Sequence, residues 1–210
     1  MTDKKIKILT LSDHPLTPSG VGTQARYIIE GMLKTGKYQF ISFGGLIKHK
    51  DYRPIKTDQF GDDWVIIPTD GYGTPEAVRA MLWSEKPDVV WFMTDPRFWG
   101  WLWQIEEEIR YNVPMVYYHV WDNLPYPKFN KASYDSNDFI ATISKVTDDI
   151  VANVSPDVDR QYVPHAVDLD VYKPLDQKEL EEIREENFKQ DKDKFIIGII
   201  EMPAARWHQV

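Results

Sequence analysis

Residues 5–36 read KIKILTLSDHPLTPSGVGTQARYIIEGMLKTG, and three kinds of sequence follow one another in this stretch. Residues 6–11 are an apolar run with the length of a buried strand. Residues 12–23 are rich in Pro, Gly and Ser and predict a loop. Apolar residues then recur at the spacing of one helical face, and Gly36 lies where a helix commonly ends. That face consists of Ala25, Ile28, Ile29, Met32 and Leu33. The order predicts the first unit of an α/β fold.

The same alternation continues along the chain. Residues 89–93, VVWFM, are apolar without interruption, which is typical of a strand buried on both faces of a parallel sheet. Thr74 and Pro75 have the residue types of a helix N-cap and a first helical position, and Pro87 ends that helix. Further strands are expected at 38–43, 64–67, 115–120, 139–143, 161–163 and 195–200.

Further helices are expected at 98–111, at 144–154 and from 176 onward. In the first of these the inward stripe is Phe98, Trp101, Leu102, Ile105 and Ile109. In the second, Ser144 is the expected cap and Val146, Ile150, Val151 and Val154 face inward. In the third, Asp176 and Glu179 have the spacing of a capping box, with Asp in place of Ser or Thr. The pattern predicts an α/β protein with a Rossmann-like doubly wound parallel sheet.

The composition narrows the class of protein. The chain has 210 residues, with 25 Lys and Arg against 33 Asp and Glu, and a net charge of −8. This acidic balance argues against a nucleic-acid-binding surface, which needs clustered Lys and Arg. The absence of cysteine excludes disulfides, thiolate nucleophiles and Cys-based metal sites. No apolar run approaches the roughly 20 residues of a membrane span, and no signal peptide is recognised, so we expect a soluble cytoplasmic protein.

The first candidate site is the glycine-rich segment at the start of the first helix. In parallel α/β sheets, ligands bind outside the carboxyl ends of the strands, and a helix N-terminus favours an anion there. Gly20, Gly22 and Ala25 also match G-x-G-x-x-A. The match to a dinucleotide site is weak, because about eight residues separate the strand from the first Gly and no acid stands at 43–45. A glycine-rich turn without a ligand is the structural alternative.

Polar residues follow two further predicted strands. Asp95 comes after the strand at 88–93, and His119 and Asp122 come at the end of the strand at 115–120. These residues converge on one edge of the sheet if the strands are parallel. Asp95 could instead cap the next helix, and His119 could be a core histidine. Asp122 follows its strand in a Pro- and Asn-containing loop, where a carboxylate accepts hydrogen bonds from hydroxyl groups.

Four segments, in order, resemble the amino-terminal half of retaining, family-4-type glycosyltransferases of the GT-B fold. Residues 5–36 are similar to that family's first strand, Gly-rich loop and first helix. Residues 116–127, VYYHVWDNLPYP, followed by residues 133–151, SYDSNDFIATISKVTDDIV, resemble its acidic strand-end loop and then its strand ending in Ser before a helix. Residues 162–175, YVPHAVDLDVYKPL, resemble the Pro-His-Gly-Val-Asp…Phe-x-Pro signature that closes its first domain, with Ala166 in place of Gly and Tyr172 in place of Phe.

The resemblance implies two Rossmann-like domains that face a cleft. The first mainly holds a carbohydrate or glycosylated acceptor, and the second binds a nucleotide-sugar donor without a metal or other cofactor. Asp122 is then the catalytic-site carboxylate that contacts a sugar. The substrate-binding candidates are Gly20, Val21, Gly22, Thr23, Asp95, His119 and His165. His165 matches the signature but is equally typical of a structural position.

The resemblance also divides the chain. Residues 1–174 are expected to form the acceptor-side domain, 175–194 a charged connecting helix, and 195–210 the beginning of the donor domain. The donor site and the family's E-x₇-E motif are not found, so we expect the chain alone to be inactive. The last ten residues depart from the family pattern, and a frameshift near Ile200 would restore it. The apolar strand at 195–200 predicts association into a homo-oligomer.

Other functions stay open at this point. The chain could be a non-catalytic binding or partner module that supplies its cleft to another chain. It could be part of a related GT-B sugar-nucleotide epimerase. A flavodoxin-like or NAD-binding protein is the least favoured alternative, because the dinucleotide pattern is incomplete.

Overall fold

We describe a computed structural model of the chain, in which residues 4–191 and 193–198 are described. The chain divides into two compact units, one ending at Ala166 and the other beginning at Val167. The first unit contains the sheet and the candidate functional residues up to His165. The sequence places the end of the first domain at 174 instead, eight residues further along.

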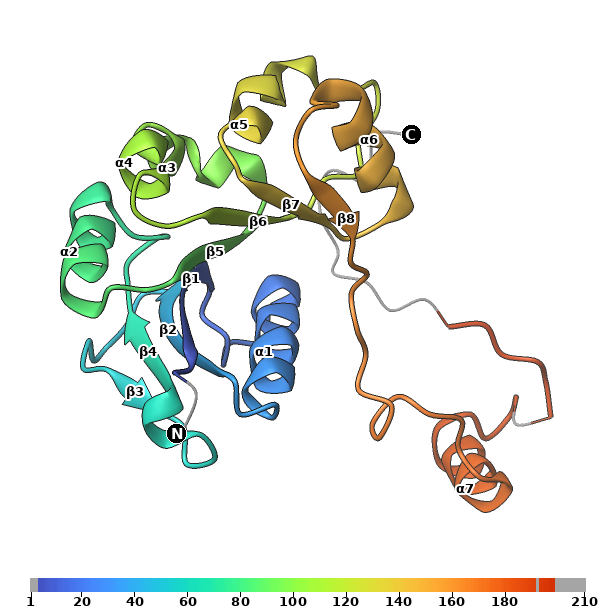
Figure 1. Ribbon diagram of the computed structural model, residues 1–210. Helices are drawn as coiled ribbons and strands as arrows, with labels where there is room; N and C mark the ends of the chain where they lie inside the picture. The colour runs from blue at the N-terminus through green and yellow to red at the C-terminus, as the bar shows by residue number, and fades with distance from the viewer. Residues whose placement is uncertain (1–3, 192, 199–210) are drawn as a thin grey trace. The chain divides into compact units, whose positions relative to one another are not determined.

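The first unit is built on one eight-stranded sheet in the order β3-β4-β2-β1-β5-β6-β7-β8 (Figure 1). All neighbouring strands are parallel except β3, which runs antiparallel to β4 at the edge. The strands are β1 (Ile6–Asp13), β2 (Tyr38–Gly45), β3 (Ile55–Lys56), β4 (Trp64–Pro68), β5 (Val89–Thr94), β6 (Met115–His119), β7 (Phe139–Thr142) and β8 (Arg160–Tyr162). The predicted α/β fold with a Rossmann-like parallel sheet is therefore confirmed.

Helices lie on both faces of the sheet. They are α1 (Gly20–Leu33), α2 (Pro75–Glu85), α3 (Gly100–Trp103), α4 (Glu106–Arg110), α5 (Lys131–Asp135) and α6 (Lys145–Val154), with short 3₁₀ turns η1 (Gly61–Asp63), η2 (Pro96–Phe98) and η3 (Lys128–Asn130). Three N-caps fix where the longer helices begin: Ser19, Thr74 and Ser144 each accept a backbone N–H of the first turn. None of the helices in the described part of the chain has the length and apolarity that a bilayer crossing needs.

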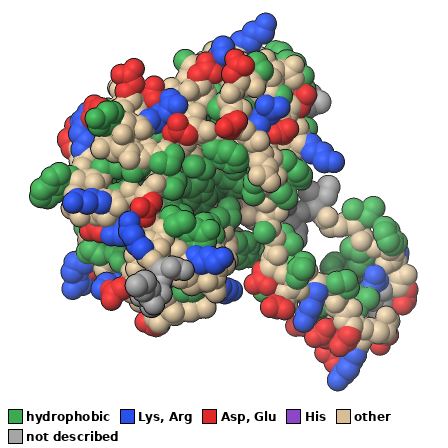
Figure 2. All heavy atoms as spheres, viewed as in Figure 1, with side chains coloured by type: hydrophobic (Ala, Val, Ile, Leu, Met, Phe, Trp, Pro, Cys, Tyr) green, Lys and Arg blue, Asp and Glu red, His purple; other side chains and the backbone are tan. Residues whose placement is uncertain are grey.

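The two faces of the sheet form two separate cores. Odd-numbered residues of β1, such as Leu9 and Leu11, pack with side chains of α2, α3, α4, α5 and α6 on one face. On the other face, Ile8 packs with side chains of α1, such as Ile29. Figure 2 shows hydrophobic side chains gathered in a hollow on the molecule in this view. Burial on both faces explains why β5 is apolar without interruption.

The helix expected at 98–111 is broken into η2, α3 and α4. The expected inward stripe began at Phe98, but Phe98 is 47% exposed and Trp99 is buried instead. The residues that reach the core are Trp99, Leu102, Ile105 and Ile109, all buried. The bond from the Ile105 N–H to the Leu102 carbonyl spans three residues, so this region tightens toward 3₁₀ geometry. Burial of the large indole therefore overrides regular helical spacing.

In α6, one inward residue was predicted wrongly. Val146 is 48% exposed, whereas Thr147 is buried. The Thr147 hydroxyl donates to the Trp121 carbonyl over 2.7 Å, which satisfies a polar group in the interior. Apolar periodicity cannot identify such a position, because the buried residue there is polar.

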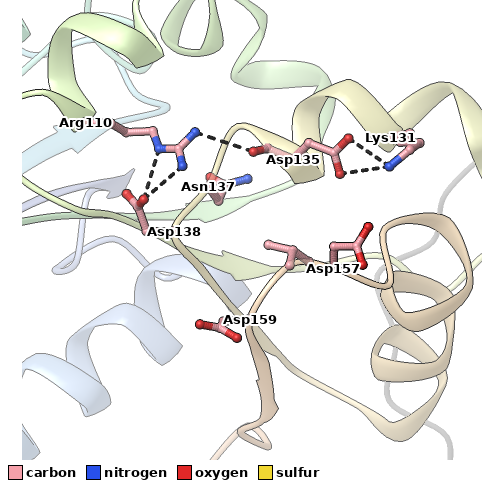
Figure 3. Close-up of a pocket in the computed structure, with 8 residues that line it drawn as sticks. Arg110, Lys131, Asp135, Asn137, Asp138, Asp157 and Asp159 are labelled. Atoms are coloured by element: carbon pink, nitrogen blue, oxygen red, sulfur yellow. Dashed lines mark hydrogen bonds and ion pairs between the residues drawn. The ribbon is translucent and has the colours of Figure 1, made fainter.

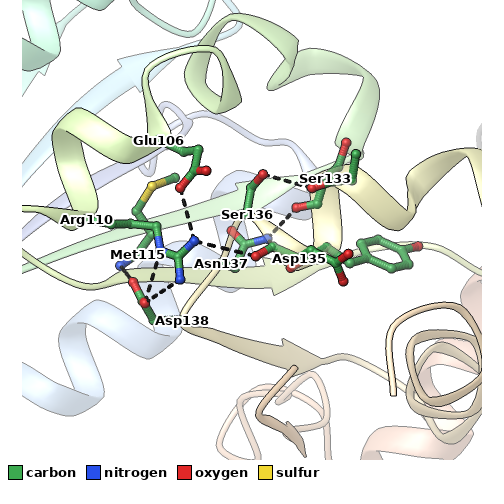
Figure 4. A network of polar contacts seen from close by, with 10 residues as sticks. Glu106, Arg110, Met115, Ser133, Asp135, Ser136, Asn137 and Asp138 are labelled. Atoms are coloured by element: carbon green, nitrogen blue, oxygen red, sulfur yellow. Dashed lines mark hydrogen bonds and ion pairs between the residues drawn. The ribbon is translucent and has the colours of Figure 1, made fainter. Parts of the chain in front are cut away.

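Two aspartates act alike at the amino edge of the sheet. Asp88 precedes β5, and its carboxylate accepts the Lys7 N–H over 2.8 Å. Asp138 precedes β7, and its carboxylate accepts the Met115 N–H over 2.8 Å (Figure 4). Their own N–H groups donate to the carbonyls of Lys7 and Met115. Each aspartate therefore satisfies an N–H within the first two residues of the neighbouring strand and fixes the register there.

The second unit contains α7 (Gln177–Asn187), which begins with the predicted capping box. Asp176 accepts the Glu179 N–H over 2.8 Å, and the Glu179 carboxylate accepts the Asp176 N–H over 3.2 Å. The strand predicted at 195–200 is not formed at residues 195–198. Residues 199–200 of that strand and the ten residues assigned to a frameshift lie outside the described residues.

Candidate functional site

The topology brings the sequence-predicted segments to one edge of the sheet. The strands β1, β5 and β6 are consecutive in the sheet order, and all three are parallel. The Gly20–Thr23 turn follows β1, Asp95 follows β5 and Asp122 follows β6. All three segments therefore lie at the carboxyl edge, where α/β proteins bind ligands.

A buried carboxylate that sequence reasoning missed organises this edge. Asp13 is the last residue of β1 and is only 4% exposed. It accepts hydrogen bonds from the Ser19 hydroxyl over 2.7 Å and from the Tyr72 hydroxyl over 2.8 Å. Burial and this carboxylate raise the pKa of Tyr72. The strand β1 continues two residues beyond the apolar run at 6–11 and ends at Asp13. An acid two residues after an apolar run was the sequence signal that could have identified this residue.

The glycines of the first turn of α1 have different roles. A Cβ on Gly22 would lie 2.7 Å from the His14 carbonyl oxygen and 2.9 Å from the Ser19 hydroxyl, so only glycine fits there. A Cβ on Gly20 would meet nothing within 4 Å. Val21 is partly buried against the α1-side core. Gly22 is therefore required by the packing of the turn itself, as the structural alternative proposed.

The N-terminus of α1 is joined to the segment that follows β8. The Gln24 side-chain amide donates to the Ala166 carbonyl over 2.8 Å, and its oxygen accepts the Ala166 N–H over 3.0 Å. This paired contact joins residues 142 positions apart in sequence. The exposed His165 beside it lies with its ring 5.8 Å from the Tyr118 ring, and partial desolvation lowers its pKa. Thr23, the residue before Gln24, lies in the same first turn of α1.

Asp95 caps a turn and holds an arginine. It accepts the Arg97 N–H over 2.9 Å and two guanidinium N–H groups of Arg97 over 2.8 and 2.7 Å. Burial raises the pKa of Asp95, but the hydrogen bonds and charge of Arg97 outweigh it and the pKa is lowered. Asp95 therefore does cap the turn that follows β5, as the alternative interpretation expected. The same carboxylate also holds the guanidinium of Arg97 at this edge of the sheet.

His119 lies in the interior. It is fully buried, and its Nε2 is 2.7 Å from the Tyr134 hydroxyl. Burial lowers the pKa of His119 to about 3, so the ring is neutral at pH 7. Its Nδ1 has no partner among the described residues. This environment matches the core-histidine alternative, with Tyr134 as the partner.

Asp122 lies in the loop after β6 and is exposed. In the described part of the chain no hydrogen bond or ion pair engages its carboxylate. The preceding residue is held firmly: the Trp121 carbonyl accepts from Thr147 over 2.7 Å, and the Trp121 indole donates to the Asn123 carbonyl over 3.1 Å. Asp122 therefore combines a fixed backbone with a carboxylate that is open to a ligand hydroxyl.

A polar cavity of about 360 Å³ lies away from these residues, at the amino edge (Figure 3). Arg110 spans it, with 3.0 Å to Asp138 and 3.1 Å to Glu106, and Lys131 pairs with Asp135 over 2.9 Å. Asp135 also accepts the Ser155 hydroxyl over 2.6 Å. Because these groups satisfy one another and tie α4, α5 and β7 together, we interpret the cavity as part of the scaffold.

No protein-family model matches this chain, and no curated protein matches it either. Within residues 4–191 and 193–198, no group of three or more His, Cys, Asp or Glu is placed to hold a metal ion. The site is therefore interpreted from its own residues.

Proposed function

We propose that this chain supplies the acceptor side of a retaining GT-B glycosyltransferase, which moves a sugar from a nucleotide-sugar to a carbohydrate or glycosylated acceptor. The observation that carries the proposal is the paired hydrogen bond between Gln24 and Ala166. It joins two of the segments that carry the family resemblance, 5–36 and 162–175, although they are far apart in sequence. An accidental resemblance gives no reason for these two segments to meet.

In this proposal, Asp122 accepts a hydrogen bond from the acceptor hydroxyl and orients it toward the anomeric carbon. The new bond joins that carbon to the acceptor oxygen, the bond to the donor phosphate breaks, and the proton of the acceptor hydroxyl passes to the departing phosphate oxygen. Orientation of this kind is a large part of the catalytic effect in group transfer. The turn at Gly20 and Val21 presents helix N–H groups that precede the first intrahelical bonds and suit a phosphate. The donor and its E-x₇-E motif are assigned to a second domain, and the cytoplasmic location remains a prediction.

The end of β2 argues against a dinucleotide-binding protein. It carries Gly44 and Gly45 where an NAD site needs an acid for the ribose. The His14 ring fills the space beside Gly44 that a side chain there would take. An acidic side chain at position 44 would therefore collide with His14.

A partner module is the second candidate function. Apolar side chains of the second unit are widely exposed, including Leu169 at 72% and Phe195 at 89%. Exposed apolar surface of this kind commonly marks a contact with another protein. This candidate predicts partner binding without any affinity for sugars.

The test is a chemical-shift titration of the ¹⁵N-labelled 210-residue chain with methyl pyranosides, UDP- and GDP-sugars, NAD and FMN. We expect methyl pyranosides to shift the amide of Asp122, and UDP- and GDP-sugars to shift the amides of the Gly20–Thr23 turn through their phosphates. Asp122→Asn should weaken the pyranoside binding at least fivefold, because a carboxylate forms stronger hydrogen bonds than an amide. Asp157→Asn, at the amino edge, is the matched control and should leave the binding unchanged.

Two outcomes contradict the proposal. In one, no carbohydrate shifts amides at the carboxyl edge, which leaves the partner module. In the other, NAD or FMN binds there more tightly than any sugar, which restores a nucleotide-cofactor protein.

A further inference from the structure

Two loops at the carboxyl edge expose aromatic side chains beside charged ones. Phe98 follows β5 in η2, and Trp121 and Phe129 lie in the long segment between β6 and α5. Phe129 is 75% exposed and Phe98 is 47% exposed, whereas Trp121 is half-buried. We call Trp121 and Phe129 the aromatic platform. A single exposed ring needs no explanation, but several at a ligand-binding edge do.

The platform has a defined geometry. The Phe129 ring lies 6.0 Å from the Trp121 ring at an interplanar angle of 73°, an edge-to-face pair. The Arg97 guanidinium carbon lies 6.0 Å from the centre of the Trp121 ring, at the outer limit of a cation–π contact. Hydrogen bonds of Trp121 to Asn123 and Thr147 fix its backbone and its ring. The platform is therefore preorganised before any ligand arrives.

Polar groups suited to hydroxyls surround the rings. Asp122 follows Trp121 directly in the chain, and its carboxylate is open to solvent. Arg97 is 73% exposed and uses two of its donor nitrogens on Asp95, so it retains further N–H groups for a ligand. A surface that alternates ring faces with a carboxylate and a guanidinium matches a molecule with an apolar face and a hydroxyl rim. Pyranose rings have this character, because their axial C–H bonds form a face and their hydroxyls point outward.

We propose that the aromatic platform binds the pyranose ring of the acceptor, with its C–H face against the exposed ring of Phe129 and its edge against the exposed part of Trp121. Asp122 accepts its hydroxyl protons in hydrogen bonds, and Arg97 donates to its oxygens. The inference rests on the proposed function and names the acceptor as a pyranoside. An anionic membrane surface fits the platform less well, because Asp95 and Asp122 border it and the chain carries a net charge of −8.

The experiment uses the full 210-residue chain labelled with 5-fluorotryptophan and observed by ¹⁹F NMR. The Trp121 resonance is assigned by its loss in Trp121→Phe, and the Trp83 resonance by its loss in Trp83→Phe. Methyl α-glucoside, methyl α-mannoside and methyl β-galactoside are the probes, and sorbitol supplies hydroxyls without a ring face. We expect at least one pyranoside to shift Trp121 saturably, with Trp83 unmoved and sorbitol without effect. Trp83 is the control because it is 83% exposed and lies on α2.

Two variants of the site and one control variant keep the test independent of folding. Phe129→Ala should weaken pyranoside binding about fivefold or more, since an aromatic contact contributes about a factor of two to ten. Its ring is mostly exposed, so the fold should survive, and Trp83→Ala should bind like the unaltered chain. Arg97→Lys should weaken binding less than Phe129→Ala, because a lysine keeps the charge but loses the planar donor set.

The inference fails if pyranosides shift the amide of Asp122 while Trp121 stays unmoved or Phe129→Ala binds normally. In that case sugar binding at the edge stands and only the platform is lost. If neither the Asp122 amide nor Trp121 responds to any pyranoside, the proposed function fails together with the inference. A Trp121 response to vesicles of phosphatidylglycerol and phosphatidylcholine, with sugars silent, would instead assign the platform to a membrane.

Discussion

Two candidate residues on β6 and the loop that follows it have opposite environments. His119 is fully buried against Tyr134, whereas Asp122 is exposed three residues later. The sequence made Asp122 the catalytic candidate and His119 a substrate-binding candidate, with a core histidine as the alternative for His119. The position of each residue relative to the end of β6 explains the difference. His119 is the last residue of β6 and lies on the same face as Met115 and Tyr117, which pack in the core. Asp122 lies in the loop beyond the strand. Burial makes His119 a source of pH-dependent stability.

We predict that His119→Gln removes part of the acid sensitivity of the fold. The folded-state pKa of about 3 lies below the ordinary value of 6.5. Below pH 6.5 the unfolded chain therefore binds a proton that the folded chain does not, and stability falls as the pH is lowered toward 3. The slope owed to this one histidine is about 1.4 kcal/mol per pH unit.

Urea unfolding at pH 7, 6, 5 and 4.5 measures this effect. The difference in free energy of unfolding between the variant and the unaltered chain should shift in favour of the variant as the pH falls. The lowered pKa values of His14 and His165 act in the same direction in both proteins and cancel in the difference. Parallel stability curves would show that His119 is protonated equally in both states.

At the scale of elements, local signals predicted the starts of helices well. The caps at Thr74, Ser144 and Asp176 form as expected, because an N-cap side chain bonds a backbone N–H only two or three residues away. The edge strand β3 and the short helix α5 were not predicted. Each is only a few residues long and depends on neighbours distant in sequence, so periodicity does not reveal it.

We predict that Asp138→Ala lowers the free energy of unfolding by about 1–3 kcal/mol, because the Met115 N–H at the start of β6 loses its acceptor. The ion pair with Arg110 adds little, since both side chains are about one-third exposed. Asp157→Ala is the matched control, and it should change stability by less than about 0.5 kcal/mol. Asp157 lines the same cavity, with no hydrogen bond or ion pair seen within the described residues. Equal losses in urea unfolding for the two variants would contradict the register role of Asp138.

At the scale of the whole molecule, the proposed function assigns only one wall of a catalytic cleft to this chain. Sugar transfer needs charge stabilisation and positioning from both walls, and the donor wall is assigned to a second domain. We therefore predict no sugar transfer by the 210-residue chain from UDP- or GDP-sugars to methyl pyranosides. The measurement is release of UDP or GDP with and without acceptor. Acceptor-dependent turnover on the order of 1 s⁻¹ or more, which is typical of enzymes, would falsify the assignment.

The sequence by itself determined the fold class, the strand–helix alternation and the carboxyl edge as the place of the candidate site. These follow from local periodicity, capping residues and the rule that parallel strands end together. Only the tertiary structure decided which candidates are open to a ligand. It buried His119 and assigned Gly22 to packing. It also revealed Asp13 as a buried anchor and joined Gln24 to Ala166. The physical reason is that exposure and partnership depend on residues 6 to 142 positions away, which no local pattern records.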